Sequence, residues 1–242
     1  MVALSDKNFF LFDLDDTLIN TREATEMGLA RAYRKLVSES TEASNSFPSF
    51  DKFAADLRSI YSSTKTKEGE RKFFDYDAEV FEEYCNSPEV RDLKLKHHEH
   101  SLAARLFFNF KKTKNSCLMA LPYAFEVLNT LSSLGAMSYC VTQGRCNYQH
   151  TKAMITDIEE KVESVFVTKN KIDELPGFVD HLGINPKDTV MIGDSESDIK
   201  AGVNAKIETV CVKSGKRDYG AFTTKPDIVF TDLREFMESL KK

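Results

Sequence analysis

Apolar and polar positions follow two different patterns along this chain. Near the N-terminus, the short apolar run Asn8-Phe9-Phe10-Leu11-Phe12 stops abruptly at the charged Asp13. A continuous apolar run of this length predicts a strand that is buried on both faces, as in a parallel sheet. From about residue 21 to residue 116, apolar residues recur at helical spacing, and no segment there has the pattern of a strand.

The region 21–116 is therefore expected to be helical. The expected helices are Thr21–Val37, Phe50–Ile60, Phe73–Tyr84 and Val90–Phe110. Residues 38–49 are rich in Ser, Thr and Asn and are expected to form a loop. The polar run Lys111–Ser116 is expected to be a linker to the next part of the chain.

After residue 116, short apolar runs alternate with helical patterns. The expected strands are Ala136–Val141, Val165–Val167, Thr189–Ile192, Thr209–Val212 and Ile228–Phe230. The expected helices are Tyr123–Leu134, Asn147–Ile158, Ile172–Leu182 (broken or bent near Pro176-Gly177), Ser197–Ala201 and Leu233–Leu240. This alternation predicts an α/β fold with a doubly wound parallel sheet. We expect a core made of residues 1–20 and 117–242, interrupted by an all-helical insertion at 21–116.

Composition narrows the function classes. Lys plus Arg number 33 and Asp plus Glu number 38, so the net charge of −5 argues against nucleic-acid binding through bulk charge. The longest uncharged run, Val127–Gly144, holds too many polar residues for a membrane span. The five cysteines form no CxxC pair, which argues against a disulfide framework or a structural zinc site. Reduced cysteines and an N-terminus unlike a signal peptide lead us to expect a cytoplasmic protein.

Four polar clusters each follow an expected strand of the α/β part. They are Asp13-Leu14-Asp15-Asp16-Thr17, Thr142-Gln143-Gly144-Arg145, Thr168-Lys169-Asn170-Lys171 and Gly193-Asp194-Ser195-Glu196-Ser197-Asp198. In an open parallel sheet, the carboxyl ends of the strands form the crevice in which ligands bind. We therefore expect these clusters to meet at one edge of the sheet.

The acids of the first and last clusters are candidates for a metal site. Asp13 and Asp15 are two residues apart and share a face if the segment is extended; a charged turn is an equally good explanation of this cluster alone. Gly193 permits a tight exit from its strand, with Asp194 directed into the crevice and Asp198 one helical turn later. Acids that cap a helix would look the same. Two acid clusters on one sheet edge favour a hard cation such as Mg²⁺.

The two middle clusters offer groups that bind phosphate. Thr142 carries a hydroxyl, Gly144 allows a close approach of the backbone, and Lys169 supplies a point charge. Each feature alone is common in polar turns. The informative observation is their order along the chain: an acid pair, a hydroxyl, a lysine and a second acid pair.

In this order, the clusters resemble the four motifs of the haloacid dehalogenase superfamily of phosphotransferases. Phe12-Asp13-Leu14-Asp15-Asp16-Thr17-Leu18 matches the DxDxT motif, and Val141-Thr142-Gln143-Gly144 is similar to the second motif. Lys169 is similar to the third, and Ile192-Gly193-Asp194-Ser195-Glu196-Ser197-Asp198 to the fourth, GDxxxD. The resemblance implies a Rossmann-like core with a helical class-1 cap that selects the substrate.

The resemblance also implies a role for each motif residue. Asp13 would attack phosphorus and form an aspartyl-phosphate, while Asp15 would protonate the leaving oxygen and then activate water. Mg²⁺ would be held by the Asp13 side chain, the Asp15 backbone carbonyl and Asp194. Thr142 and Lys169 would bind phosphoryl oxygens, together with backbone N–H groups near Asp15 and Gly144. Asp198 would orient Lys169 or a water on the metal.

The third motif departs from the family pattern. Family members often carry Lys-Pro there, but Lys169 is followed by Asn170. Lys169 lies 13 residues before Leu182, and this distance fits the family spacing better than the shorter distance from Lys171 to Leu182. Lys169 is therefore preferred, and Lys171 remains open.

These residues predict a Mg²⁺-dependent phosphatase that hydrolyses a small phosphorylated metabolite. Asp15 disfavours a dehalogenase, since cleavage of a carbon–halogen bond delivers no proton to an alkoxide. A phosphomutase of the same superfamily is the alternative; a receiver-type phospho-acceptor and a non-catalytic scaffold are less favoured. The sequence does not indicate which ester is used or the oligomeric state.

Overall fold

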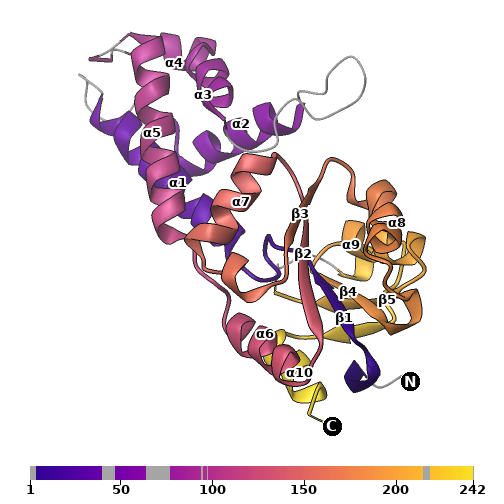
Figure 1. Cartoon of the computed structure of the whole chain (residues 1–242). Helices are drawn as coiled ribbons and strands as arrows, with labels where there is room; N and C mark the ends of the chain where they lie inside the picture. The colour runs from indigo at the N-terminus through magenta and orange to yellow at the C-terminus, as the bar shows by residue number, and fades with distance from the viewer. Residues whose placement is uncertain are drawn as a thin grey trace. The chain divides into compact units, whose positions relative to one another are not determined.

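The chain forms two compact units. The structure is a computed structural model, and it describes residues 4–39, 47–63, 77–93, 95–96, 98–214 and 219–241. One unit comprises Met1–Arg22 together with Leu118–Lys242, and the other comprises Glu23–Cys117 (Figure 1). The first unit is therefore assembled from two separate stretches of sequence.

A six-stranded parallel sheet forms the centre of the first unit. Its strands are β1 (Phe9–Phe12), β2 (Met137–Gln143), β3 (Val165–Thr168), β4 (Thr189–Gly193), β5 (Glu208–Val212) and β6 (Ile228–Phe230). The order is β3-β2-β1-β4-β5-β6, and each pair is parallel. Phe12 is in register with Cys140 of β2 and Ile192 of β4. The expected doubly wound parallel sheet is confirmed, with β1 between the two halves.

Helices cover both faces of this sheet (Figure 1). On one face, Leu11 packs in a buried cluster with Val179 of α8 (Lys171–Leu182) and Ala201 of α9 (Glu196–Asn204). On the other face lie α6 (Ala124–Ser133) and α10 (Leu233–Ser239). There Phe236 of α10 makes edge-to-face contacts with Phe10 and Phe12. Because side chains alternate between the two faces along a strand, Phe10, Leu11 and Phe12 are all buried, and Phe9 is partly buried.

Two expected helices of this unit differ from the structure. Of the break or bend expected near Pro176-Gly177, a break is wrong, because α8 continues through both residues. Pro176 has no N–H to donate to the Ile172 carbonyl one turn earlier, and the Asn204 side-chain amide donates to that carbonyl instead, at 2.8 Å. The helix expected at Asn147–Ile158 is α7 (Cys146–Ile155), which ends before the left-handed residue Asp157.

The second unit is helical in the part that the structure describes. Most of α1 (Thr21–Ser38) belongs to it, followed by α2 (Phe50–Ser63), α3 (Ala78–Cys85), α4 (Pro88–Arg91) and α5 (Glu99–Cys117). A single helix at Val90–Phe110 is wrong, since α4 ends at Arg91 and α5 begins at Glu99. Residues 40–46 of the expected loop and 73–76 of the third expected helix lie outside the described residues.

The expected linker Lys111–Ser116 is also wrong, because these residues are the last turns of α5. The apolar stripe of this helix does not stop at the buried Phe110. Lys114, one turn later, is only 2% exposed, and its ammonium lies 5.7 Å from the centre of the Phe110 ring. The methylene groups of Lys114 extend the apolar stripe, but the residue type counts as polar in a sequence pattern. For this reason the pattern predicted a linker instead of the end of a helix.

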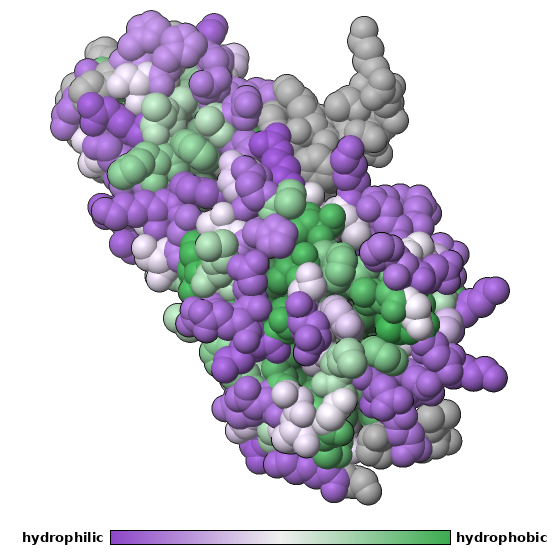
Figure 2. Space-filling view, in the orientation of Figure 1, coloured by the Kyte–Doolittle hydropathy of each residue, from purple (hydrophilic) through white to green (hydrophobic). Residues whose placement is uncertain are grey.

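The described surface is mixed in character. Hydrophilic residues cover much of the face shown in Figure 2, with hydrophobic residues exposed between them. Exposed apolar side chains include Leu134, Met154 and Val203, a pattern that is ordinary for folded proteins. Among the described helices, none has the length and apolar character needed to span a bilayer. No disulfide joins the five cysteines, all of which lie in the part of the chain that the structure describes.

Candidate active site

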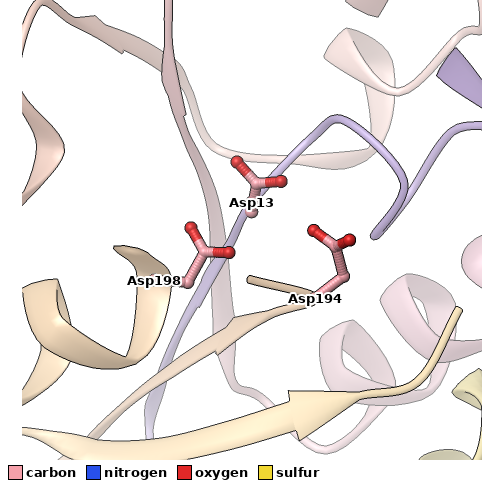
Figure 3. Close-up of side chains that lie close together, drawn as sticks. All are labelled: Asp13, Asp194 and Asp198. Atoms are coloured by element: carbon pink, nitrogen blue, oxygen red, sulfur yellow. The ribbon is translucent and has the colours of Figure 1, made fainter. Parts of the chain in front are cut away.

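Three buried aspartates meet at the carboxyl ends of the central strands (Figure 3). Asp13 follows β1, Asp194 follows β4, and Asp198 lies in the first turn of α9. One carboxylate oxygen from each lies within 4.8 Å of those of the other two. Asp13 is 7% exposed, and the other two are 1% exposed. The structure thus brings together three of the acids that the sequence singled out.

Local backbone geometry fixes two of these acids. The Asp13 N–H donates to the Ile192 carbonyl at 2.8 Å, which ties the end of β1 to β4. Asp198 belongs to the capping box that begins α9: its Oδ2 accepts from the Ser195 N–H at 3.0 Å and from the Ser195 hydroxyl at 2.5 Å. A capping box provides acceptors for backbone N–H groups of the first helical turn, which have no carbonyl partner within the helix. Helix capping therefore accounts for Asp198 Oδ2 only.

Lys171 bridges two of the acids. Its ammonium donates to Asp13 Oδ1 and, at 2.6 Å, to Asp198 Oδ1, and the residue is 3% exposed. Lys169 is exposed, and its backbone N–H donates to Glu174 at 3.0 Å. The preference for Lys169 is therefore not supported by its placement. Asn170 explains the difference, because its side chain caps α8 and makes Lys171 the first residue of the helix.

The charges of this cluster do not balance. Three carboxylates and one ammonium leave a net charge of −2 when all four groups are ionised. Burial raises the pKa of Asp13 well above its usual range; Lys171 acts in the opposite direction, and Asp198, Asp15 and Asp194 raise it further. Burial alone would lower the pKa of Lys171, but Asp13 and Asp198 raise it above its usual range. The lysine therefore stays charged, and the acids have an excess of negative charge.

This donor set fits a small hard cation. Mg²⁺ prefers carboxylate oxygens, and a divalent ion would offset the charge of −2. Both Asp198 oxygens already accept hydrogen bonds, from Lys171 and Ser195. Asp13 Oδ2 accepts a longer hydrogen bond, from Thr17 at 3.4 Å. Asp13 and Asp194 are therefore the better metal ligands, and Asp198 is better placed to hold Lys171.

The carboxylate of Asp15 has other partners. Lys152 of α7 donates to both of its oxygens at 2.9 Å, and Thr21 donates to Oδ1. Gln149 of α7 donates to Oδ2 at 2.9 Å. Burial would raise the pKa of Asp15, but Lys152 and the hydrogen bonds from Thr21 and Gln149 together lower it below its ordinary value. Asp15 is thus held as an ionised carboxylate apart from the three-aspartate cluster.

Thr142 lies near the end of β2 and is 1% exposed. Its hydroxyl oxygen accepts from Gln149 Nε2 at 2.6 Å, so the same amide contacts Thr142 and Asp15. Gly144 makes room for this amide, since a Cβ at residue 144 would lie 3.0 Å from Gln149 Cγ. Gln149 therefore bonds to residues of the first and second sequence clusters, and Lys171 bonds to residues of the first and fourth.

Comparisons with known proteins agree with this geometry. A family model described as HAD-hydrolase-like matches residues 172–236. Over 243 residues, the chain is 24% identical to glyceraldehyde 3-phosphate phosphatase of Pyrococcus furiosus, covering 96% of this chain and 92% of that protein. The enzyme of the same name from Methanopyrus kandleri is 26% identical over 218 residues, covering 85% and 84%. Together with the motif residues, these matches support a phosphatase-like hydrolase of the haloacid dehalogenase (HAD) superfamily.

Solved structures share the HAD fold. A candidate β-phosphoglucomutase from Thermotoga maritima matches with a TM-score of 0.67 at 16% identity, covering 97% of this chain and 98% of that one. A candidate HAD hydrolase, YfnB from Bacillus subtilis bound to magnesium, matches with a TM-score of 0.66 at 17% identity, covering 98% and 99%. At this identity, the likeness concerns the fold alone.

Sequence reasoning about the candidate site missed Gln149, Lys152 and Thr21. A usable signal existed for the first two. They are three residues apart on the helix that follows the second motif, so they lie on the same helix face. Both are also polar residues that can reach toward a strand end. No comparable signal marked Thr21, which is the first residue of α1.

Gly193 gives a first testable prediction. A Cβ at this position would lie 2.3 Å from Asp198 Cγ, and Asp198 is held by Lys171 and Ser195. We expect Gly193→Ala to lower the free energy of unfolding by about 1–3 kcal/mol, as overpacking does, and to lower activity. Denaturant unfolding measures the first effect.

Gly177→Ala is the matched control. A Cβ there meets nothing within 4 Å, and the residue lies inside α8. Alanine is favoured over glycine within a helix by roughly 0.5–1 kcal/mol, so this variant should be at least as stable as the wild type. Equal stability of the two variants would contradict the steric role of Gly193.

Proposed function

We propose that this protein is a Mg²⁺-dependent phosphatase that hydrolyses a small phosphate monoester through an aspartyl-phosphate. The observation that carries the proposal is the arrangement of two separately held carboxylates, two residues apart. Asp13 lies among acids with Lys171, and Asp15 lies beside Thr142 through Gln149. One carboxylate can then attack phosphorus while the other moves protons. The two relatives named as phosphatases support the same activity.

In the first step, an oxygen of Asp13 attacks phosphorus, and the bond from phosphorus to the leaving oxygen breaks. Asp15 enters this step protonated and gives its proton to that oxygen, which returns Asp15 to the ionised form that its partners favour. Lys171 and the Thr142 hydroxyl bind phosphoryl oxygens, because phosphoryl transfer depends on positioning and on charge stabilisation. The proposal thus replaces Lys169 with Lys171. Bound by Asp13, Asp194 and the Asp15 backbone carbonyl, Mg²⁺ supplies positive charge that lessens the repulsion between Asp13 and the phosphate.

In the second step, water attacks phosphorus and the bond between phosphorus and Asp13 breaks. The electron pair returns to the Asp13 carboxylate, and Asp15 takes the proton of the water. Asp15 is held in the ionised form that this step needs. The lack of disulfides among the five described cysteines fits a reducing compartment, and we propose the cytoplasm.

The proposal is tested by assaying free phosphate from a panel of phosphorylated metabolites with Mg²⁺ and with EDTA. Glyceraldehyde 3-phosphate is the first substrate to try, given the names of two relatives. We expect release with Mg²⁺ and none with EDTA. Transfer of phosphate between two positions of a sugar phosphate, without release, would indicate a phosphomutase instead. Full activity in EDTA would contradict the metal role.

Metal binding has a readout that does not depend on turnover. Because the acids have excess negative charge, we expect Mg²⁺ to stabilise the folded wild type and so to raise its Tm. At a concentration of Mg²⁺ a hundred times its Kd, the free energy of unfolding should rise by about 2.7 kcal/mol. Asp194→Asn should reduce this rise. Thermal unfolding with and without Mg²⁺ measures both. An equal rise in the variant would exclude Asp194 as a ligand.

A further inference from the structure

Two side chains of α7 hold Asp15 in place. Gln149 and Lys152 lie three residues apart, on one face of the helix. The Lys152 ammonium is 2.9 Å from each Asp15 oxygen, and the Gln149 amide is 2.9 Å from Oδ2. The side chains of Lys152 and Asp15 are 13% and 29% exposed, so water screens this pair only in part. The contacts fix the orientation of the carboxylate.

The Gln149 amide also fixes the direction of the Thr142 hydroxyl. Its nitrogen has three acceptors around it: Asp15 Oδ2, Thr142 Oγ1 at 2.6 Å and the Gln143 carbonyl at 3.0 Å. A carboxylate and a carbonyl only accept, so the atom facing them is the NH₂ group, which donates. Thr142 accepts from it and keeps its own proton for another acceptor. A phosphoryl oxygen is the acceptor that the proposed function supplies.

We propose that Gln149 and Lys152 are positioning residues for the second half of the reaction. They hold the Asp15 carboxylate beside Thr142, where it takes the proton from the attacking water as the bond between phosphorus and Asp13 breaks. The proposal rests on the proposed function. Its physical basis is that a catalytic base works only within a narrow range of distance and angle from the proton it removes.

Rapid mixing with p-nitrophenyl phosphate and Mg²⁺ separates the two half-reactions. Nitrophenolate is a stable anion that leaves without a proton donor, so forming the phosphoenzyme makes little demand on Asp15. Hydrolysing the phosphoenzyme still requires it. Gln149→Met and Lys152→Met keep the side-chain length and remove the polar groups.

At saturating substrate, we expect for both variants a burst of about one nitrophenolate per active site at nearly the wild-type rate. The steady-state rate after the burst should be lower than in the wild type by roughly tenfold or more, within the range for loss of a general base. Acid quenching followed by intact-mass measurement should show one phosphoryl group on the enzyme.

Two further variants serve as controls. Lys161→Met makes the same change at an exposed lysine and should behave like the wild type. Lys152→Arg can still pair with a carboxylate and should recover most of the steady-state rate. In addition, Gln149→Met should weaken competitive inhibition by inorganic phosphate, whereas Lys152→Met should not, because only Gln149 contacts Thr142.

The outcomes separate this inference from the proposed function. If the wild type hydrolyses p-nitrophenyl phosphate but the variants slow the burst and the steady state equally, the role of these residues is structural and the inference is wrong. Unchanged kinetics in both variants would also overturn it. An unchanged inhibition constant for phosphate in Gln149→Met would overturn the part that concerns Thr142. A wild type without phosphatase activity would instead contradict the proposed function.

Discussion

Asp13→Asn should reduce phosphate release by at least about a thousandfold, as loss of a covalent nucleophile does in other enzymes. The amide has the same shape as the carboxylate but cannot form the bond to phosphorus. Phosphate release under saturating Mg²⁺ measures the loss. An acid-quenched sample should show no phosphoryl group on the variant.

The stability of Asp13→Asn distinguishes a chemical effect from unfolding. Burial raises the pKa of Asp13, so at neutral pH the ionised acid is less favourable in the folded chain than in the unfolded one. A neutral amide removes that cost, and in the absence of Mg²⁺ we expect the Tm not to fall. A variant that keeps wild-type, Mg²⁺-dependent activity would exclude Asp13 as the nucleophile.

Lys171→Met should have the second largest effect. It removes the ammonium that bridges Asp13 and Asp198 and leaves buried carboxylates without a counter-charge. Loss of one partner from a buried ion pair costs about 3–5 kcal/mol, which we expect as a lower free energy of unfolding without Mg²⁺. Activity should fall by at least about a hundredfold, the range for loss of an electrostatic donor. Denaturant unfolding and phosphate release measure the two effects.

Lys169→Met is the matched control, since this exposed lysine lies two residues away on the same segment. We expect its stability to stay within about 0.5 kcal/mol of the wild type, as for ordinary surface substitutions. A catalytic loss confined to Lys169→Met would restore Lys169 as the phosphate-binding lysine.

The strands could be predicted because each is a local apolar run. All six expected strands are present, and their ends place Asp13, Thr142 and Asp194 at one edge of the sheet. The order of the strands and the identity of the covering helices depend on pairing between distant segments, which a local pattern does not contain. The end of α5 was missed for a related reason: Lys114 is polar by type but buried by packing.

The candidate site could be predicted only as far as residue types at strand ends allow. Choosing between Lys169 and Lys171 depends on where α8 begins, and the Asn170 cap decides that. The family spacing counted back from Leu182 pointed to the other lysine. The two partners of Asp15 on α7, Gln149 and Lys152, lie more than 130 residues away in the sequence, so their contact with it follows from the folded sheet alone.

The position of β1 in the middle of the sheet has a consequence for how the protein is made. On the ribosome, β1 emerges first, but its neighbours β2 and β4 begin at Met137 and Thr189. Between them comes the helical unit, Glu23–Cys117, a continuous segment whose internal contacts are available before β1 has a partner. Domains generally fold as units during synthesis. The apolar Phe9–Phe12 segment therefore has no partner strand until β2 has been synthesised. The residues of the candidate site come together only after Asp198 has been translated.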